Sequence, residues 1–190
     1  MPDPYPRIVA EAQARAAAVG FEFSCEPGVG RLLAVLAAAA RPGGRILELG
    51  TGVGVGLAWL VHGLGERRDV ELISVDLDAG IQSVARQGSW PPFVCFELGD
   101  GAERVRELGR FELIFPDAPG GKLFGLPHTI DALAPGGVLL ADDMDLARHE
   151  DPGLRSALVA VRRQLHAHPE LLVSELDTGS GVVLAARRSS

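Results

Sequence analysis

Acidic residues stand at the ends of five successive apolar runs, and this spacing has a clear chemical meaning. The acids are Glu48, Asp76, Asp100, Asp117 and the pair Asp142 and Asp143. A single acid after a strand commonly caps the next helix. Acids at five successive strand ends would line one rim of a parallel sheet, where open α/β sheets bind their ligands. The pattern therefore favours a ligand that carries positive charge or many hydroxyl donors.

A glycine-rich turn follows the first of these runs. Residues 45–60 read RILELGTGVGVGLAWL, with glycines at positions 50, 52, 54 and 56. A turn of this kind between a strand and a helix usually holds a ligand against the helix N-terminus. The dinucleotide fingerprint G-x-G-x-x-G/A fails in every register, because its third position falls on Val55, Leu57 or Trp59. A dinucleotide would also place its pyrophosphate near Glu48.

S-adenosylmethionine suits this turn better than a dinucleotide does. It carries an ammonium and a sulfonium group and no phosphate, so an acidic turn with Glu48 tolerates it. Its ribose needs an acceptor for two hydroxyls, and Asp76 is placed for this role, 26 residues after Gly50. Glycines in the turn would let the backbone approach the methionine portion closely.

Five segments resemble, in order, the motifs of class I S-adenosylmethionine-dependent methyltransferases, and most closely those of the small catechol/caffeoyl-CoA-type O-methyltransferases. The segments are ILELGTGVGVG, ISVDLD, ELGDGAERV, FELIFPDAPGGK and LAPGGVLLADDM, and the likeness extends from about Glu26 to the end of the chain. The resemblance implies an S-adenosylmethionine-dependent enzyme that methylates a small hydroxylated, catechol-like acceptor. The cofactor contacts that it implies are Glu48, Gly50, Thr51, Gly52, Asp76, Leu77, Asp100, Gly101, Ala102 and Asp117. Among them, Glu48, Gly50 and Gly52 would meet the methionine part, and Asp100 with Gly101 and Ala102 the adenine end.

The same resemblance implies a metal site. In the catechol-type family a divalent cation is held by an acid after strand four and by an acid–amide pair after strand five. The matching residues here are Asp117, Asp142 and Asp143. Oxygen ligands suit Mg²⁺, Mn²⁺ or Ca²⁺. Because Asp143 replaces the amide and adds charge, an alternative remains open, in which Asp143 caps the next segment and Asp117 contacts cofactor or solvent.

The catalytic lysine of this family is displaced in the sequence. The family places it three residues after the strand-four acid, where this chain has Gly120, whereas Lys122 stands five residues after Asp117. Lys122 is the only lysine in the chain. A desolvated lysine can act as a base and an arginine cannot. We predict Lys122 and Asp117 as the catalytic residues, with His128 and His149 as alternative bases.

An alternation of strand and helix patterns must position these residues. Strands are expected at 45–49, 70–75, 93–98, 111–115, 137–141, 171–176 and 181–186, and helices at 6–19, 28–40, 54–65, 78–87, 101–108, 123–133 and 152–167. The alternation predicts an α/β fold with a Rossmann-like, doubly wound, mostly parallel sheet and helices on both faces. The short DTGSG turn predicts a final antiparallel hairpin, which agrees with the seven-stranded sheet that the resemblance implies.

Length predicts a single domain of 190 residues, with N-terminal helices in 1–43 and a cofactor-binding core in 44–190. The N-terminal helices carry more apolar surface than a peripheral position needs. We therefore expect them to cover the site or to form a homodimer contact.

Composition excludes several classes of partner. The net charge of −7 gives no general attraction for nucleic acid, and no apolar run is long enough to span a bilayer. The N-terminus lacks the apolar core of a signal peptide, and Cys25 and Cys95 match no zinc or redox spacing. These features predict a cytoplasmic protein whose partner is a small-molecule acceptor. A metal-independent methyltransferase for another acceptor and a non-catalytic cofactor-binding module remain open alternatives.

Overall fold

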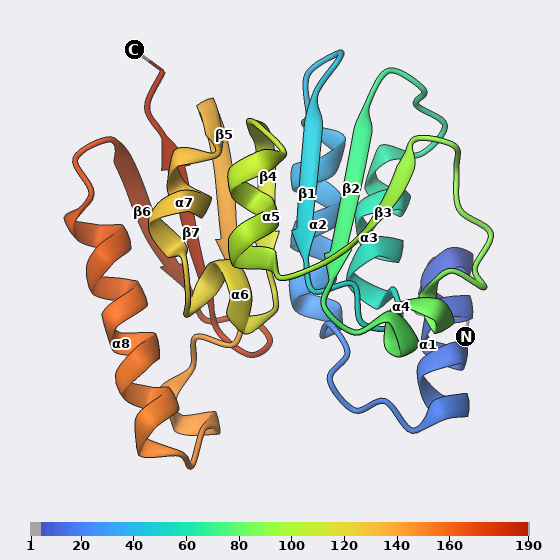
Figure 1. Ribbon diagram of the computed structural model, residues 1–190, viewed down its shortest axis with the longest axis horizontal. Helices are drawn as coiled ribbons and strands as arrows, with labels where there is room; N and C mark the ends of the chain where they lie inside the picture. The colour runs from blue at the N-terminus through green and yellow to red at the C-terminus, as the bar shows by residue number, and fades with distance from the viewer. Residues whose placement is uncertain (1–4, 190) are drawn as a thin grey trace.

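The computed structural model describes residues 5–189 and contains one seven-stranded sheet (Figure 1). Its strands are β1 (Arg45–Leu49), β2 (Glu71–Asp76), β3 (Val94–Leu98), β4 (Phe111–Pro116), β5 (Leu133–Ala141), β6 (Leu171–Leu176) and β7 (Val182–Arg187). They lie in the order β3-β2-β1-β4-β5-β7-β6, and β7 runs antiparallel to both of its neighbours while the other pairs are parallel. The predicted fold class is confirmed.

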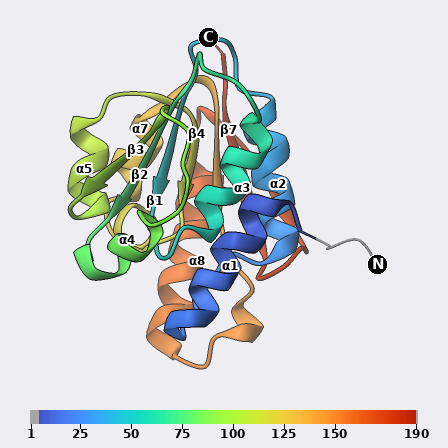
Figure 2. The same cartoon turned by 90° about the vertical axis from the view of Figure 1, so that its right-hand side faces the viewer.

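Helices cover both faces of the sheet, as Figure 2 shows from its edge. The buried hydrophobic residues that the structure describes form two cores, one on each face of the sheet. The first core includes residues of α1 (Arg7–Val19), α2 (Pro27–Ala38) and α3 (Val55–Leu64). The second includes residues of α5 (Gly101–Glu107), α7 (Leu126–Asp131) and α8 (Pro152–Ala167). The short elements α4 (Ala79–Ala85), α6 (Pro119–Lys122) and the 3₁₀ helix η1 (Leu146–Arg148) follow strand ends. Alternate residues of each strand feed the two cores, so that Ile46 packs in the first and Leu47 in the second.

Local sequence signals explain where the helices begin. The helix α8 starts at Pro152, and the carboxylate of Asp151 before it accepts a hydrogen bond of 2.7 Å from the amide of Gly153. Its apolar stripe of Leu158, Val161 and Leu165 is buried against the sheet. The predicted helix at 152–167 is therefore confirmed to the residue.

The predicted helix at 123–133 is shorter in the structure. The chain forms α6, then a turn, then α7, which covers only Leu126–Asp131. Gly125, inside the predicted range, has a positive φ angle of 80°, which interrupts a helix at that point. The strand β5 consequently begins at Leu133, four residues before the predicted start.

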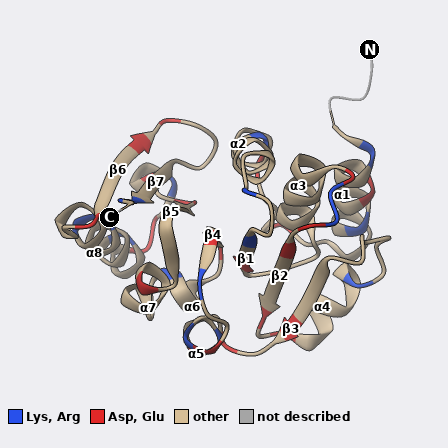
Figure 3. Ribbon diagram, turned by 90° about the horizontal axis from the view of Figure 1, so that it is seen from above, with Lys and Arg blue, Asp and Glu red and all other residues tan. Residues whose placement is uncertain are grey.

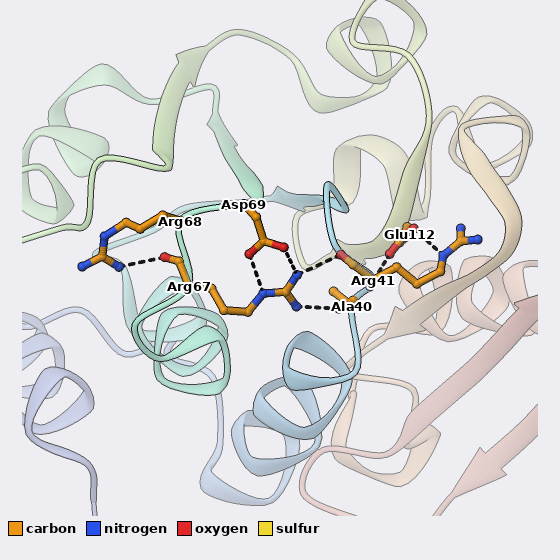
Figure 4. Close-up of polar contacts among 6 residues, drawn as sticks. All are labelled: Ala40, Arg41, Arg67, Arg68, Asp69 and Glu112. Atoms are coloured by element: carbon orange, nitrogen blue, oxygen red, sulfur yellow. Dashed lines mark hydrogen bonds and ion pairs between the residues drawn. The ribbon is translucent and has the colours of Figure 1, made fainter.

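A cluster of polar contacts ties the chain together at the amino ends of the strands (Figure 4). The Arg67 guanidinium forms a bidentate pair with Asp69, at 2.8 and 2.9 Å, and donates to the carbonyl oxygens of Ala40 and Arg41. Arg41 in turn pairs with Glu112 at the start of β4, at 2.7 Å. This Arg67 cluster joins the turns that precede β1 and β2 to the start of β4.

The strand order and the distribution of charge are both visible in the view from above (Figure 3). Acidic and basic positions are interspersed among the elements, in keeping with the moderate net charge of −7. Among residues 5–189, every helix is too short or too polar to cross a bilayer. The predictions for residues 1–4 and Ser190, which belong to the proposed single domain, lie outside the described residues.

Candidate functional site

A cavity of about 660 Å³ lies at the carboxyl ends of the central parallel strands. The strand order reverses between β1 and β4, which is where doubly wound sheets place their ligands. One wall is the segment between α1 and α2, and the other is the segment between β5 and α8. The acids and cations among the lining residues are Glu22, Glu26, Asp76, Asp78, Asp117, Lys122, Asp142, Asp143, Arg148 and His149.

The glycine turn after β1 forms the floor of this cavity. Gly50 and Gly52 line it and have φ angles of 109° and 52°, a region that favours glycine. A Cβ atom on Gly50 would lie 2.8 Å from the amide nitrogen of Ala118, because the turns after β1 and β4 touch at this point. The two glycines are therefore needed for the backbone to turn and for the two strand ends to meet.

Asp76 lies at the rim of the cavity, and its carboxylate holds two turns. Oδ2 accepts a hydrogen bond of 2.8 Å from the amide of Gly52, and Oδ1 accepts one of 2.9 Å from the amide of Asp78. Each carboxylate oxygen has a second acceptor position. Asp76 can thus still accept from two hydroxyls of a ligand, as the sequence predicts.

Glu48 does not line the cavity and lies behind the turn. Its side chain is fully buried, and Ser74 Oγ donates to Oε2 at 2.5 Å, while Ser74 also bonds Thr51 at 2.7 Å. Burial raises the pKa of Glu48 well above its ordinary value. The carboxyl group and Thr51 thus support the turn from within the core. The predicted contact of Glu48 with the methionine part of a cofactor, and that of Thr51 with the cofactor, stay predictions.

The residues predicted for the adenine end lie beside the cavity rather than in its wall. Asp100 caps α5 by accepting a 2.7 Å hydrogen bond from the amide of Ala102, and Gly101 opens the helix. A Cβ atom on Gly120 would lie 3.0 Å from Asp100 Oδ1, so the turns after β3 and β4 meet here. Leu77 is 72% exposed on the same side. Their contacts with a cofactor also stay predictions.

Lys122 lies among the carboxyl ends of β4 and β5. Its Nζ donates hydrogen bonds of 3.1 Å to the carbonyl oxygens of Asp117 and Asp142, and it lies 3.9 Å from Asp143 Oδ2. The side chain is almost entirely buried yet contributes to the cavity wall. Although Lys122 is two residues later in the sequence than the family's lysine, its Nζ lies between the strand ends that carry Asp117 and Asp142.

The acids around Lys122 have raised pKa values. Burial raises the pKa of Asp117 to about 7, against the opposing effect of the Lys122 charge and with smaller contributions from Asp142 and Asp143. Burial likewise raises the pKa of Asp142, although Ser180 Oγ and the amide of Asp143 both donate to its Oδ1. The group of three carboxylates is therefore costly to ionise fully.

The arrangement of these donors does not fit the predicted metal site. Among residues 5–189, no group of three His, Cys, Asp or Glu side chains is placed to hold a metal ion. Asp142 Oδ1 is engaged by Ser180, and Asp143 has a left-handed backbone with φ 60° and a half-exposed side chain. The Lys122 ammonium already lies between the strand ends, where it would repel a divalent cation.

The two alternative bases are in different places. His149 lines the cavity, and its Nε2 lies 2.8 Å from the carbonyl oxygen of Asp143. His128 is exposed on α7 and does not line the cavity. His149 therefore remains a candidate for the base, whereas His128 lies outside this site.

The sequence predicts that the N-terminal helices cover the site, whereas the residues that line the cavity belong to the segment between α1 and α2. Phe21, Phe23 and Cys25 line it, and the ring of Phe21 lies so close to Gly52 that a Cβ there would approach it to 3.2 Å. Glu26 forms a 2.5 Å ion pair with Arg148 across the cavity mouth. These contacts join residues that are distant in the sequence. The local sign of a cavity wall in this segment is the aromatic pair in FEFSCEPG, between two helical stretches.

Comparisons with known proteins agree with this geometry. A family description, "Methyltransferase domain", matches residues 47–144, from β1 to the end of the acidic pair. A Mycobacterium tuberculosis protein described as a probable O-methyltransferase is 34% identical over 200 residues, which cover 95% of this chain and 84% of the relative.

Solved structures share the whole fold. The O-methyltransferase TomG from Streptomyces achromogenes, solved with S-adenosylmethionine, has a TM-score of 0.81 at 20% identity and covers 99% of this chain and 92% of its own. An O-methyltransferase from Bacillus cereus, solved with S-adenosylhomocysteine, has a TM-score of 0.78 at 20% identity. The match covers 99% of this chain and 94% of the Bacillus cereus chain. The chain therefore belongs to the methyltransferases, within the O-methyltransferase group.

Proposed function

We propose that the protein methylates a hydroxyl group of a small, catechol-like acceptor held in the cavity beside the cofactor. The observation that carries this proposal is a juxtaposition within one cavity. The glycine turn and Asp76 line one part of it, and Asp117 and Lys122 line another. A cofactor site and a site for proton transfer thus adjoin, which is what direct methyl transfer requires.

The cofactor half would be formed by the ends of β1 to β4. Gly50 and Gly52 leave room for the methionine part, and Asp76 would accept from the ribose hydroxyls. Asp100, with Gly101 and Ala102, would meet the adenine end. When bound, S-adenosylmethionine supplies a methyl group on a sulfonium sulfur, which leaves as a neutral thioether when an acceptor oxygen takes the methyl.

The acceptor half would lie between the two walls of the cavity. Phe23, Leu154 and Leu158 supply apolar contacts, and Asp117 and Lys122 supply the polar ones. The cavity of about 660 Å³ is of a size that holds a cofactor with a small aromatic acceptor. The Asp117 carboxylate would accept the proton of the acceptor hydroxyl as the oxygen–methyl bond forms.

The test is calorimetry followed by a turnover assay. S-adenosylhomocysteine should bind and NAD should not, because the turn lacks the fingerprint that accommodates a pyrophosphate. Methyl transfer is then measured over a panel of catechols and simple phenols. Equal affinity for NAD and S-adenosylhomocysteine would remove the cofactor assignment. Tight cofactor binding without transfer to any member of the panel would favour a non-catalytic binding module.

We also propose that the protein forms a homodimer through its N-terminal helices. Val19 and Val35, on α1 and α2, are 51% and 66% exposed, and both are aliphatic. Burial of such side chains against a second copy would be favourable. Light scattering at micromolar concentration measures the mass, and a monomer would contradict this proposal.

A further inference from the structure

One fixed cation lies between the carboxyl ends of β4 and β5, and it belongs to the chain itself. Lys122 Nζ is held at 3.1 Å from the carbonyl oxygens of both Asp117 and Asp142. We infer that the Lys122 ammonium orients and activates the acceptor oxygen directly, so that methyl transfer by this protein needs no divalent metal ion. This inference rests on the proposed function and names the group that would activate its acceptor.

The position of Lys122 leaves one donor for a ligand. An ammonium group has three N–H donors, and two of them are taken by the main-chain carbonyls. Its nearest carboxylate oxygen, Asp143 Oδ2, is 3.9 Å away, too far for a direct hydrogen bond. Because the lysine lines the cavity, the third N–H can reach an acceptor oxygen there.

The carboxylates near this ammonium are engaged within the protein and, among residues 5–189, form no group that could hold a metal ion. Asp142 directs Oδ1 to Ser180 and to the amide of Asp143, so this oxygen serves hydrogen bonds within the protein. The main-chain carbonyls that would otherwise point at a cation are taken by Lys122. A divalent cation placed among these groups would meet a like charge at close range in a poorly solvated setting.

The chemistry expected of the ammonium is electrostatic. A hydroxyl that loses its proton to Asp117 becomes negatively charged as it attacks, and a charge-assisted hydrogen bond from Lys122 would stabilise that charge. The oxygen–carbon bond forms, the carbon–sulfur bond breaks, and sulfur keeps the electron pair. In this arrangement Lys122 is a catalytic residue that donates a hydrogen bond to the attacking oxygen, and the proton acceptor is a carboxylate.

The first experiment measures metal binding without any assay of activity. Protein freed of metal with EDTA is titrated with Mn²⁺, and bound Mn²⁺ is followed by electron paramagnetic resonance. The wild-type chain should bind no Mn²⁺ at this site, whereas Lys122→Met should bind Mn²⁺ more tightly, because its acids lose a fixed positive neighbour. A wild-type Mn²⁺ site that Asp142→Ala removes would overturn the inference.

The second experiment measures turnover. EDTA-treated wild-type protein should retain its full rate, and added Mg²⁺ or Mn²⁺ should leave that rate unchanged. Lys122→Met should lower kcat by about 100-fold or more, the loss typical of one transition-state donor, with the affinity for S-adenosylhomocysteine unchanged. Lys122→Arg keeps the charge and should retain part of the rate. Arg163→Met, which removes an exposed cation of α8 away from the cavity, is the matched control.

The outcomes separate this inference from the proposed function. Loss of turnover on EDTA treatment, restored by Mg²⁺, would overturn the role of Lys122 and leave the methyltransferase proposal intact. Absence of S-adenosylhomocysteine binding would remove the proposed function, and the Mn²⁺ titration would still decide whether the lysine excludes a metal. If Lys122→Met does not fold, the wild-type titration and Lys122→Arg decide the question.

Discussion

The amide of Gly52 donates a 2.8 Å hydrogen bond to the carboxylate of Asp76, which joins the turn after β1 to the end of β2. A side chain placed in this way serves both the fold and the ligand. It fixes the turn that would hold the methionine part, and it presents its remaining acceptor positions to the ribose. The predicted effect of removing it is therefore twofold.

Asp76→Ala should weaken the binding of S-adenosylhomocysteine by roughly 1–3 kcal/mol, because two ribose hydroxyls lose their acceptor. That loss corresponds to about 5- to 150-fold in Kd, which calorimetry measures directly. Asp151→Ala is a useful control, since Asp151 caps α8 and does not line the cavity. Similar losses in both variants would indicate that Asp76→Ala acts through general stability and not through the ribose.

Gly50→Ala should destabilise the protein and prevent cofactor binding. Its Cβ would lie 2.8 Å from the amide nitrogen of Ala118, and the residue would keep an unfavourable φ of 109°. Gly20→Ala is the matched control, because its φ is 65° but its Cβ would meet nothing within 4 Å. Strain alone costs about 1–2 kcal/mol. Urea unfolding should show a larger loss for Gly50→Ala than for Gly20→Ala.

The two cysteines should react at very different rates with a thiol reagent. Burial, followed by the negative charges of Asp117 and Asp142, raises the pKa of Cys25 well above its ordinary value, whereas Cys95 is exposed. A rapid phase equivalent to one thiol is expected, and Cys95→Ser should abolish that phase. A rapid phase that persists in Cys95→Ser would show that the segment over the cavity opens readily.

Asp117→Asn should make the fold more stable at pH 8, at the expense of turnover. The pKa of Asp117 is raised to about 7, so the folded state holds its proton more firmly than the unfolded state does. Stability contributed by the protonated form is present at low pH and is lost as pH rises through about 7. The stability difference between Asp117→Asn and wild type should therefore shrink as pH falls towards 4, which denaturant titrations can follow.

Arg67→Ala should lower the midpoint of thermal unfolding and leave the affinity for S-adenosylhomocysteine unchanged. The guanidinium contacts Asp69 and two main-chain carbonyls at the amino ends of the strands, away from the cavity. Its hydrogen bond lowers the pKa of Asp69 to about 2, so this contribution is present at neutral pH and is lost as pH falls from about 4 towards 2. A change in cofactor affinity would show that the two ends are coupled.

Much of the scaffold could be predicted because its signals are local. The strand at 45–49 and the helix at 152–167 were placed to the residue, one from an apolar run and the other from a proline start with a regular stripe. The helix at 123–133 is shorter in the structure, because the positive φ angle of Gly125 accompanies its close approach to Ala102, which periodicity does not reveal. The local hydrophobic pattern therefore predicts where helices and strands occur, but it does not predict where a helix is interrupted.

The site was predictable in outline and not in its contacts. Four of the strand-end acids, Asp76, Asp117, Asp142 and Asp143, line one cavity, since parallel strands bring their carboxyl ends to one edge. The burial of Glu48 behind the turn depends on Ser74, 26 residues away, and the place of Lys122 depends on the end of β5. Such relationships join distant parts of the chain, so a single sequence carries no local sign of them.

The Arg67 cluster and the cavity occupy opposite ends of the same strands, and this separation bears on how the protein can change. Substitutions that alter acceptor preference tend to cost stability, because they disturb strained turns and buried acids. Here the joins before β1 and β2 and at the start of β4 can be strengthened without touching any residue of the cavity wall. In laboratory evolution, stabilising substitutions at the amino ends of the strands could therefore offset the stability lost when residues of the cavity wall are varied.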